Sequence, residues 1–230
     1  MDSRIDYYGQ HLEKVNNLCE EGDISTAWDT CKEVAKQARR EGDKAFANFF
    51  EAEALALDGD LKRAARLQEK SVQEIGLVPY ALGNCAVIMS MAGKPHKAVE
   101  YLDEVLNLNN GNLQALGQKG VSLAKMGYDE EALDCFEKIL ELDPGQNHAL
   151  RNKAVSLSRL GKEDEALAIF DQVLLENPTD KHARSERSIL LDEMNLRGTP
   201  LGWLLLWVRK RLAPSLLRIR YRREPAEPSA

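Results

Sequence analysis

The chain has 230 residues, of which 43% are hydrophobic and 6% aromatic, and this balance predicts a packed, soluble protein built from helices. Its charge is unevenly spread, because residues 197–230 carry a net charge of +6 and residues 1–196 carry −12. Since the acidic part lacks the basic stripe that phosphate groups require, we expect no nucleic-acid partner.

The N-terminus, MDSRIDYYGQ, is polar and does not have the pattern of a signal peptide, which predicts a cytoplasmic location. The four cysteines are widely spaced, at Cys19, Cys31, Cys85 and Cys135. They form no CxxC pair, and no histidine stands at a metal-ligand spacing from them. We therefore expect buried, reduced thiols, no metal site and no cofactor.

Small residues recur along the chain with a fixed period. A spacing of 34 residues separates successive members of two sets, Gly59, Gly93, Gly127 and Gly161, and Ala64, Ala98, Ala132 and Ala166. A further pair, Gly22 and Ala27, stands 37 residues ahead of the first members. A period of this length predicts stacked structural repeats.

Each repeat is predicted to contain two helices. The first three repeats span residues 8–44, 45–78 and 79–112, and the first carries three extra residues. We place these near residues 39–44, where they would lengthen the second helix of that repeat.

The fourth and fifth repeats span residues 113–146 and 147–180. In the fourth, the apolar pattern predicts a helix from Leu113 to Met126, which Gly127 ends because glycine adopts the left-handed conformation at low cost. The second helix is predicted to end before Pro144, which cannot continue it. A further helix over residues 181–196 would cap the array.

Small and bulky residues alternate in the predicted helix pairs. We expect Gly120 and Ala154 on the first helices, and Ala132 and Ala166 on the second helices, to let the two helices of a repeat approach closely. Phe136 and Phe170 are expected to fill the space between repeats.

This pattern resembles the tetratricopeptide repeat family. The resemblance rests on Gly120, Leu123, Gly127, Ala132, Phe136 and Pro144, and on Ala154, Leu157, Gly161, Ala166, Phe170 and Pro178. It weakens toward the N-terminus, and the family's tryptophan at the fourth position is replaced by Leu82, Leu116 and Leu150. The resemblance implies an all-α, right-handed superhelical solenoid of helix-turn-helix repeats.

The resemblance also implies a concave groove lined by the first helix of each repeat. The residues that it places there are Tyr80, Asn84, Val87, Gln114, Gln118, Val121, His148, Arg151, Asn152 and Val155. They form an apolar strip beside a row of amides, and Gly83 and Gly117 leave room. We expect a scaffold or adaptor that binds a helical or extended peptide; alternatively, the valines only pack against neighbouring helices.

One subclass of the family binds chaperone C-termini through a lysine, two asparagines, and a further lysine and arginine. The corresponding residues here are Phe49, Glu53, Asn84, Gln114 and Gln118, of which only Asn84 fits. We therefore expect a co-chaperone-like protein that does not bind these tails tightly. No catalytic motif stands out, and no enzymatic activity is expected.

Residues 197–230 interrupt the repeats with apolar and then basic residues. The contact residues expected there are Trp203, Leu206, Trp207, Arg209, Lys210 and Arg211. The apolar run of residues 201–208 is shorter than the roughly 18 residues of a spanning helix. Tryptophan beside arginine favours an anionic membrane surface, and thus a peripheral membrane scaffold as the alternative function. Exposed apolar patches more often mark protein contacts, which favours packing on this chain, on a second copy or on a partner protein over the membrane surface. Disorder of this segment is the third alternative.

Overall fold

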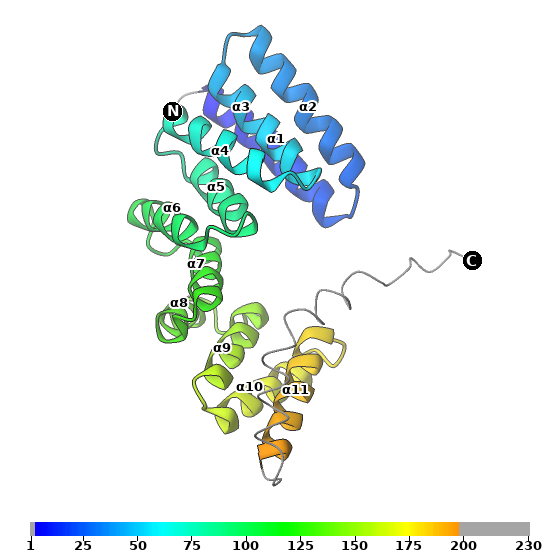
Figure 1. The fold of residues 1–230 in the computed structure, drawn as a ribbon, viewed down its shortest axis with the longest axis vertical. Coiled ribbons are helices and arrows are strands. Elements are labelled where there is room, and N and C mark those ends of the chain that lie inside the picture. The colour runs from blue at the N-terminus through cyan, green and yellow to red at the C-terminus, as the bar shows by residue number, and fades with distance from the viewer. Residues whose placement is uncertain (1–2, 198–230) are drawn as a thin grey trace, which may run out of the picture. The chain divides into compact units, whose positions relative to one another are not determined.

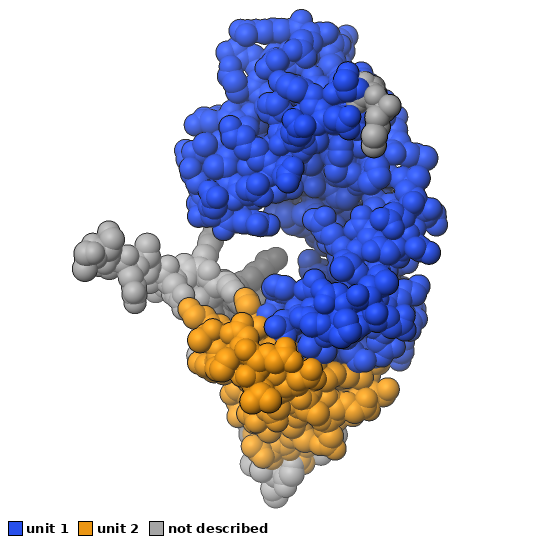
Figure 2. Space-filling model, turned by 180° about the vertical axis from the view of Figure 1, so that it is seen from behind, with its two compact units in different colours: residues 1–156 blue, residues 157–230 orange. Residues whose placement is uncertain are grey.

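The computed structural model describes residues 3–197, and these form eleven α-helices and no strand. The all-α repeat architecture expected from the sequence is confirmed. The chain divides into two compact units, residues 1–156 and 157–230, which are described separately (Figure 2).

Unit 1 is a series of helical hairpins in which each helix from α1 to α7 packs on the next one (Figure 1). Its helices are α1 (Ser3–Glu20), α2 (Ile24–Arg40), α3 (Lys44–Leu57), α4 (Leu61–Ile75), α5 (Pro79–Met91), α6 (Pro95–Leu108), α7 (Leu113–Met126), α8 (Asp129–Leu142) and most of α9 (Asn147–Arg159). Unit 2 contains α10 (Glu163–Glu176) and α11 (Lys181–Arg197).

The helices begin and end where local chemistry favours it. The side chains of Asp23, Asp43, Asp60 and Asn112 each accept a hydrogen bond from a backbone N–H in the first turn of the following helix. At the other end of α7, Gly127 has φ 85° and ψ 13°, the left-handed conformation that a glycine adopts without steric cost. These caps fix the bounds of α7 at the residues that the sequence predicts.

The first hairpin differs from the expected repeat at its start. Helix α1 begins at Ser3, whereas the sequence analysis starts the first repeat at Tyr8. The second helix has the expected extra length, because α2 contains 17 residues, compared with 15 in α4 and 14 in α6.

The N-terminal part of unit 1 has an aromatic core. Tyr8 of α1 stacks on Phe46 of α3 with ring centroids 4.2 Å apart, and Phe49 and Phe50 lie beside them. All four side chains are buried. Aromatic packing therefore holds α1 against α3 in the part of the chain where the repeat pattern is weakest.

The role expected of Gly120 and Phe136 needs correction. A Cβ atom added to Gly120 would lie 2.6 Å from Cε1 of Phe136, which belongs to the same repeat. Glycine is thus needed at this position because the Phe136 ring occupies the space, and not only because two helices approach each other. Phe136 also borders residues of the next repeat in the pocket described below.

Unit 2 is held by an apolar seam and by ion pairs between α10 and α11. Phe170 and Val173 of α10, and Ala183 and Leu190 of α11, are buried. The side chain of Arg187 also pairs with Asp171. Helix α11 thus packs on α10.

The six contact residues expected in the C-terminal segment, Trp203 to Arg211, lie outside the described residues. Among residues 3–197, no helix is both long enough and apolar enough to cross a bilayer.

Candidate functional site

A pocket of about 680 Å³ lies between α5, α7 and α9, and we call it the apolar pocket. Six of the ten groove residues predicted from the sequence line it: Val87, Gln114, Gln118, Val121, His148 and Asn152. The repeat register thus brings together side chains from three successive first helices, as the groove interpretation requires.

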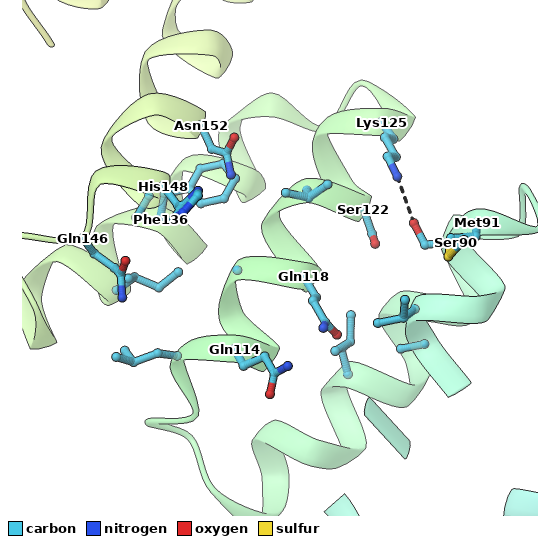
Figure 3. Close-up of a pocket in the computed structure, with 18 residues that line it drawn as sticks. Ser90, Met91, Gln114, Gln118, Ser122, Lys125, Phe136, Gln146, His148 and Asn152 are labelled. Carbon is cyan, nitrogen blue, oxygen red and sulfur yellow. Dashed lines mark hydrogen bonds between the residues drawn. The ribbon is translucent and has the colours of Figure 1, made fainter. Parts of the chain in front are cut away.

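The polar side chains of the apolar pocket come from all three helices (Figure 3). Gln114, Gln118 and Ser122 stand on successive turns of α7. His148 and Asn152 lie on α9, and Ser90 on the α5 side accepts a hydrogen bond of 3.2 Å from Nζ of Lys125. The amides can each donate and accept hydrogen bonds, which suits them to a polypeptide backbone.

Apart from the amide of Gln146, the remaining lining of the apolar pocket is hydrocarbon and thioether. Leu102, Phe136 and Ile139 are buried behind it, Val121 is half-buried, and Met91 is 53% exposed at its edge. Flexible methionines adapt to ligands of different shape. An apolar surface with a few convergent polar groups is the usual composition of a binding site.

A second pocket, of about 770 Å³, is lined by residues of α1, α5 and α7, and we call it the acidic pocket because Asp6 and Glu13 line it. Tyr80 and Asn84 line it, together with Gln114 and Gln118, which also line the apolar pocket. Leu102 is common to both. The two pockets therefore adjoin along α7.

Tyr80 lines the acidic pocket and also makes contacts within the chain. Its hydroxyl donates a hydrogen bond of 2.9 Å to the carbonyl oxygen of Ile5 in α1. Its ring also lies against Gly9, where an added Cβ atom would be 3.2 Å from Cε1 of Tyr80. Tyr80 thus fastens α1 to α5, and its hydroxyl is engaged within the chain.

Two predicted groove residues line neither pocket. Arg151 donates a hydrogen bond of 2.8 Å from Nη2 to Nδ1 of His148, so its contact is with a pocket residue. Val155 is half-buried on α9, one turn further along the helix.

Glu53 is a functional candidate that the sequence analysis treated only as a mismatch to the chaperone-binding pattern. It stands 34 residues before Val87, so it occupies the equivalent groove position as a half-buried carboxyl group. It accepts a hydrogen bond of 3.2 Å from Nε2 of Gln68 and a second bond from Asn84. Burial outweighs these bonds and raises the pKa of Glu53 to about 7. An acid within the valine strip is the signal that could have identified it.

The cysteines do not form a reactive group in the described structure. Cys31, Cys85 and Cys135 are buried free thiols, whereas Cys19 is half-buried, contrary to the expectation that all four are buried. Burial raises the pKa of Cys85 to about 12 and also raises the pKa of Cys19. Within residues 3–197, no three His, Cys, Asp or Glu side chains are arranged to hold a metal ion.

Comparison with known proteins identifies the repeat class. Two tetratricopeptide repeat family models match residues 113–146 and 130–185. A comparison with curated proteins gives no match. Residues 113–185 therefore match the tetratricopeptide repeat family, and the described helices form an all-α repeat solenoid.

Solved structures share this fold at low sequence identity. One is YrrB, a tetratricopeptide repeat protein with an unusual peptide-binding site, at 21% identity and a TM-score of 0.60 over 77% of this chain and 90% of that one. A tetratricopeptide repeat protein from Parabacteroides merdae has 19% identity and a TM-score of 0.64, over 95% of this chain and 80% of its own. MamA from MSR-1 has 24% identity and a TM-score of 0.56, over 75% of this chain and 95% of its own.

Proposed function

We propose that unit 1 binds a polypeptide segment in the groove formed by the apolar and acidic pockets, and that the protein acts as a non-enzymatic interaction scaffold. The proposed contact residues are Asn84, Val87, Gln114, Gln118, Val121, His148 and Asn152. Arg151 positions His148, and Val155 extends the contact surface along α9.

The observation that carries this proposal is the presence of two glycines inside helices that face the groove. A Cβ atom added to Gly83 would meet nothing within 4 Å, and one added to Gly117 would meet only Cδ1 of Ile139 at 3.7 Å. Glycine inside a helix is destabilising by roughly 0.5–1 kcal/mol relative to alanine. Neither internal packing nor a left-handed backbone accounts for these two glycines. Close approach of a ligand backbone does account for them.

The pocket chemistry supports a peptide as the ligand. Half-buried valines offer an apolar surface to side chains, and the amides of Gln118 and Asn152 can pair with the N–H and C=O groups of a bound backbone. The fold similarity to YrrB, which has a peptide-binding site, is in keeping with this proposal.

Selection from a phage-displayed library of random peptides tests the proposal. Selected peptides are labelled with fluorescein, and their binding to the wild type, Gly117→Ala and Gly117→Leu is measured by fluorescence polarisation. Leucine at position 117 should fill the apolar pocket and weaken binding by about tenfold or more, a loss of about 1.4 kcal/mol. Alanine should weaken binding by a smaller factor than leucine, because its single methyl group occupies part of the space that the ligand backbone would approach.

Peptides that bind all three proteins equally would contradict the proposal, as would a library that yields no binder. Circular dichroism of each variant checks that the helices are intact, so that a loss of binding is not a loss of fold.

A further inference from the structure

Helix α1 forms one wall of the acidic pocket. It is held against α5 by the hydrogen bond between Tyr80 and Ile5 and by the contact between Tyr80 and Gly9. Next to Gly9, Tyr8 stacks on Phe46 of α3 in the core. Contacts with α5 and α3 therefore both hold α1 in place beside the acidic pocket.

The formal charge on the lining of the acidic pocket is negative. Asp6 and Glu13 line it from α1, one about two turns after the other, and both side chains are exposed. Neither makes a hydrogen bond or an ion pair with another residue in the described part of the chain. No Lys, Arg or His is among the described residues that line this pocket. Two carboxylates thus face the groove without a counter-charge.

Amides surround these carboxylates. They come from all three helices and their connections: Gln10, Asn16, Asn84, Asn112, Gln114 and Gln118. Asn84 also donates to Glu53, so a third carboxyl group lies directly behind the pocket wall. The carboxylates of Asp6 and Glu13 accept hydrogen bonds but cannot donate them, so the lining of the acidic pocket offers more acceptors than donors.

The apolar pocket has the opposite character. Its cationic residue is Lys125, which already donates to Ser90, and its lining includes no carboxylate among the described residues. The two pockets adjoin through Leu102, Gln114 and Gln118. A single bound segment would thus meet an apolar surface on one side of α7 and acceptors with negative charge on the other.

We propose that the acidic pocket binds a Lys or Arg side chain of the partner, so that the partner is a peptide segment in which apolar residues adjoin basic ones. This inference rests on the proposed peptide-binding function and adds the chemistry of the partner. A cationic side chain would pair with Asp6 and Glu13 while its amide-rich surroundings accept its remaining N–H groups.

The test uses two fluorescein-labelled helical peptides. Both have leucines at helical spacing, and the positions between them are arginine in one peptide and glutamine in the other. Wild-type protein should bind the arginine peptide about five- to tenfold more tightly, as expected for two partly exposed ion pairs. This preference should decrease as salt is added, because salt screens exposed charges.

The matched variants separate the site from the overall charge of the protein. Asp6→Asn combined with Glu13→Gln should remove most of the preference. The control, Glu20→Gln combined with Asp29→Asn, changes the net charge equally at exposed positions outside both pockets and should retain the preference. Asp6→Lys combined with Glu13→Lys should instead prefer a peptide that carries glutamate in place of arginine.

Several outcomes would overturn the inference. Equal binding of the arginine and glutamine peptides, with both lost in Gly117→Leu, would refute the cationic subsite while leaving the groove function intact. An equal effect of the control variant would attribute the preference to net charge. Self-association of the wild type that disappears in the Asp6→Asn, Glu13→Gln variant would identify a second copy as the occupant, in place of a separate partner. Binding that ignores Gly117→Leu altogether would contradict the proposed function itself.

Discussion

Gly83, Gly117 and Gly120 lie within helices of unit 1, and packing gives them different roles. Gly120 makes room for the ring of Phe136, whereas Gly83 and Gly117 leave open space beside the groove. The sequence shows the same residue type at each position. Only the neighbouring atoms reveal whether the missing side chain serves the core or a ligand.

Gly120→Ala should lower the free energy of unfolding by about 1–2 kcal/mol. The added methyl group collides with the buried Phe136 ring, at a cost of about 1–3 kcal/mol, and the better helix propensity of alanine offsets up to about 1 kcal/mol. Gly83→Ala is the matched control and should stabilise by about 0.5–1 kcal/mol, because its methyl group meets no atom. Urea denaturation followed by circular dichroism measures both changes. Equal effects of the two substitutions would contradict the packing described for Phe136.

Glu53 shows how one residue can change the way in which the stability of a fold depends on pH. The ionisable groups that face it are the thiols of Cys19 in α1, Cys31 in α2 and Cys85 in α5, and Gln68 in α4 is neutral. These thiols have raised pKa values and remain uncharged near neutral pH. The carboxyl group of Glu53 therefore ionises without a cationic partner among them.

The wild type should become less stable as pH rises from about 5 to 8. The pKa of Glu53 is about 7 in the folded protein and near 4.5 when the chain is unfolded. Its contribution is therefore fully present below about pH 4.5 and is lost as pH rises through about 7. The loss should be on the order of 1–3 kcal/mol. Glu53→Gln keeps a hydrogen-bond acceptor but cannot ionise, so its stability should be flatter over this range. Parallel profiles of the two proteins, measured by urea denaturation, would contradict the raised pKa.

At the scale of the helices, local sequence signals predict correctly where helices begin and end. The apolar spacing and Gly127 predict α7 from Leu113 to Met126, and the structure has these bounds. Pro144 likewise marks the end of α8 at Leu142. Short-range signals suffice here because caps, glycines and prolines act within one helical turn.

The placement of α1 depends on contacts that the repeat pattern does not contain. The Tyr80–Ile5 hydrogen bond joins residues 75 apart in sequence, and it engages the hydroxyl of a predicted groove residue within the fold. The acidic pocket exists because α1 is held there. Neither feature follows from a 34-residue period, since that period relates only equivalent positions in neighbouring repeats.

Tyr80→Phe should loosen α1 with little effect elsewhere. The substitution removes the hydrogen bond to Ile5 while keeping the ring against Gly9, at a cost of about 0.5–1.5 kcal/mol. Hydrogen exchange should accelerate in the first turns of α1, whereas the amides of α7 and α8 serve as the internal reference and should not change. Unchanged exchange in α1 would show that the aromatic core alone holds this helix.

At the scale of the whole molecule, the family models match a shorter part of the chain than the structure describes. The models match residues 113–185, where the repeat residues are closest to the family pattern. The structure continues the same helical hairpins through α1 to α6, with the aromatic core of Tyr8 and Phe46 in the first two hairpins. The contacts predicted for Trp203, Trp207 and the basic residues after them lie outside the described residues and stay predictions.

The sequence by itself predicted that the chain consists of helical repeats and where α7 and α8 end, and six of the ten residues expected in the groove line the apolar pocket. It could do so because periodicity and capping are local properties of the chain. Tertiary structure alone decided that α1 closes one side of that groove, that Tyr80 is engaged within the fold and that Glu53 titrates near neutral pH. These properties depend on burial and on contacts between distant residues, which no single repeat contains.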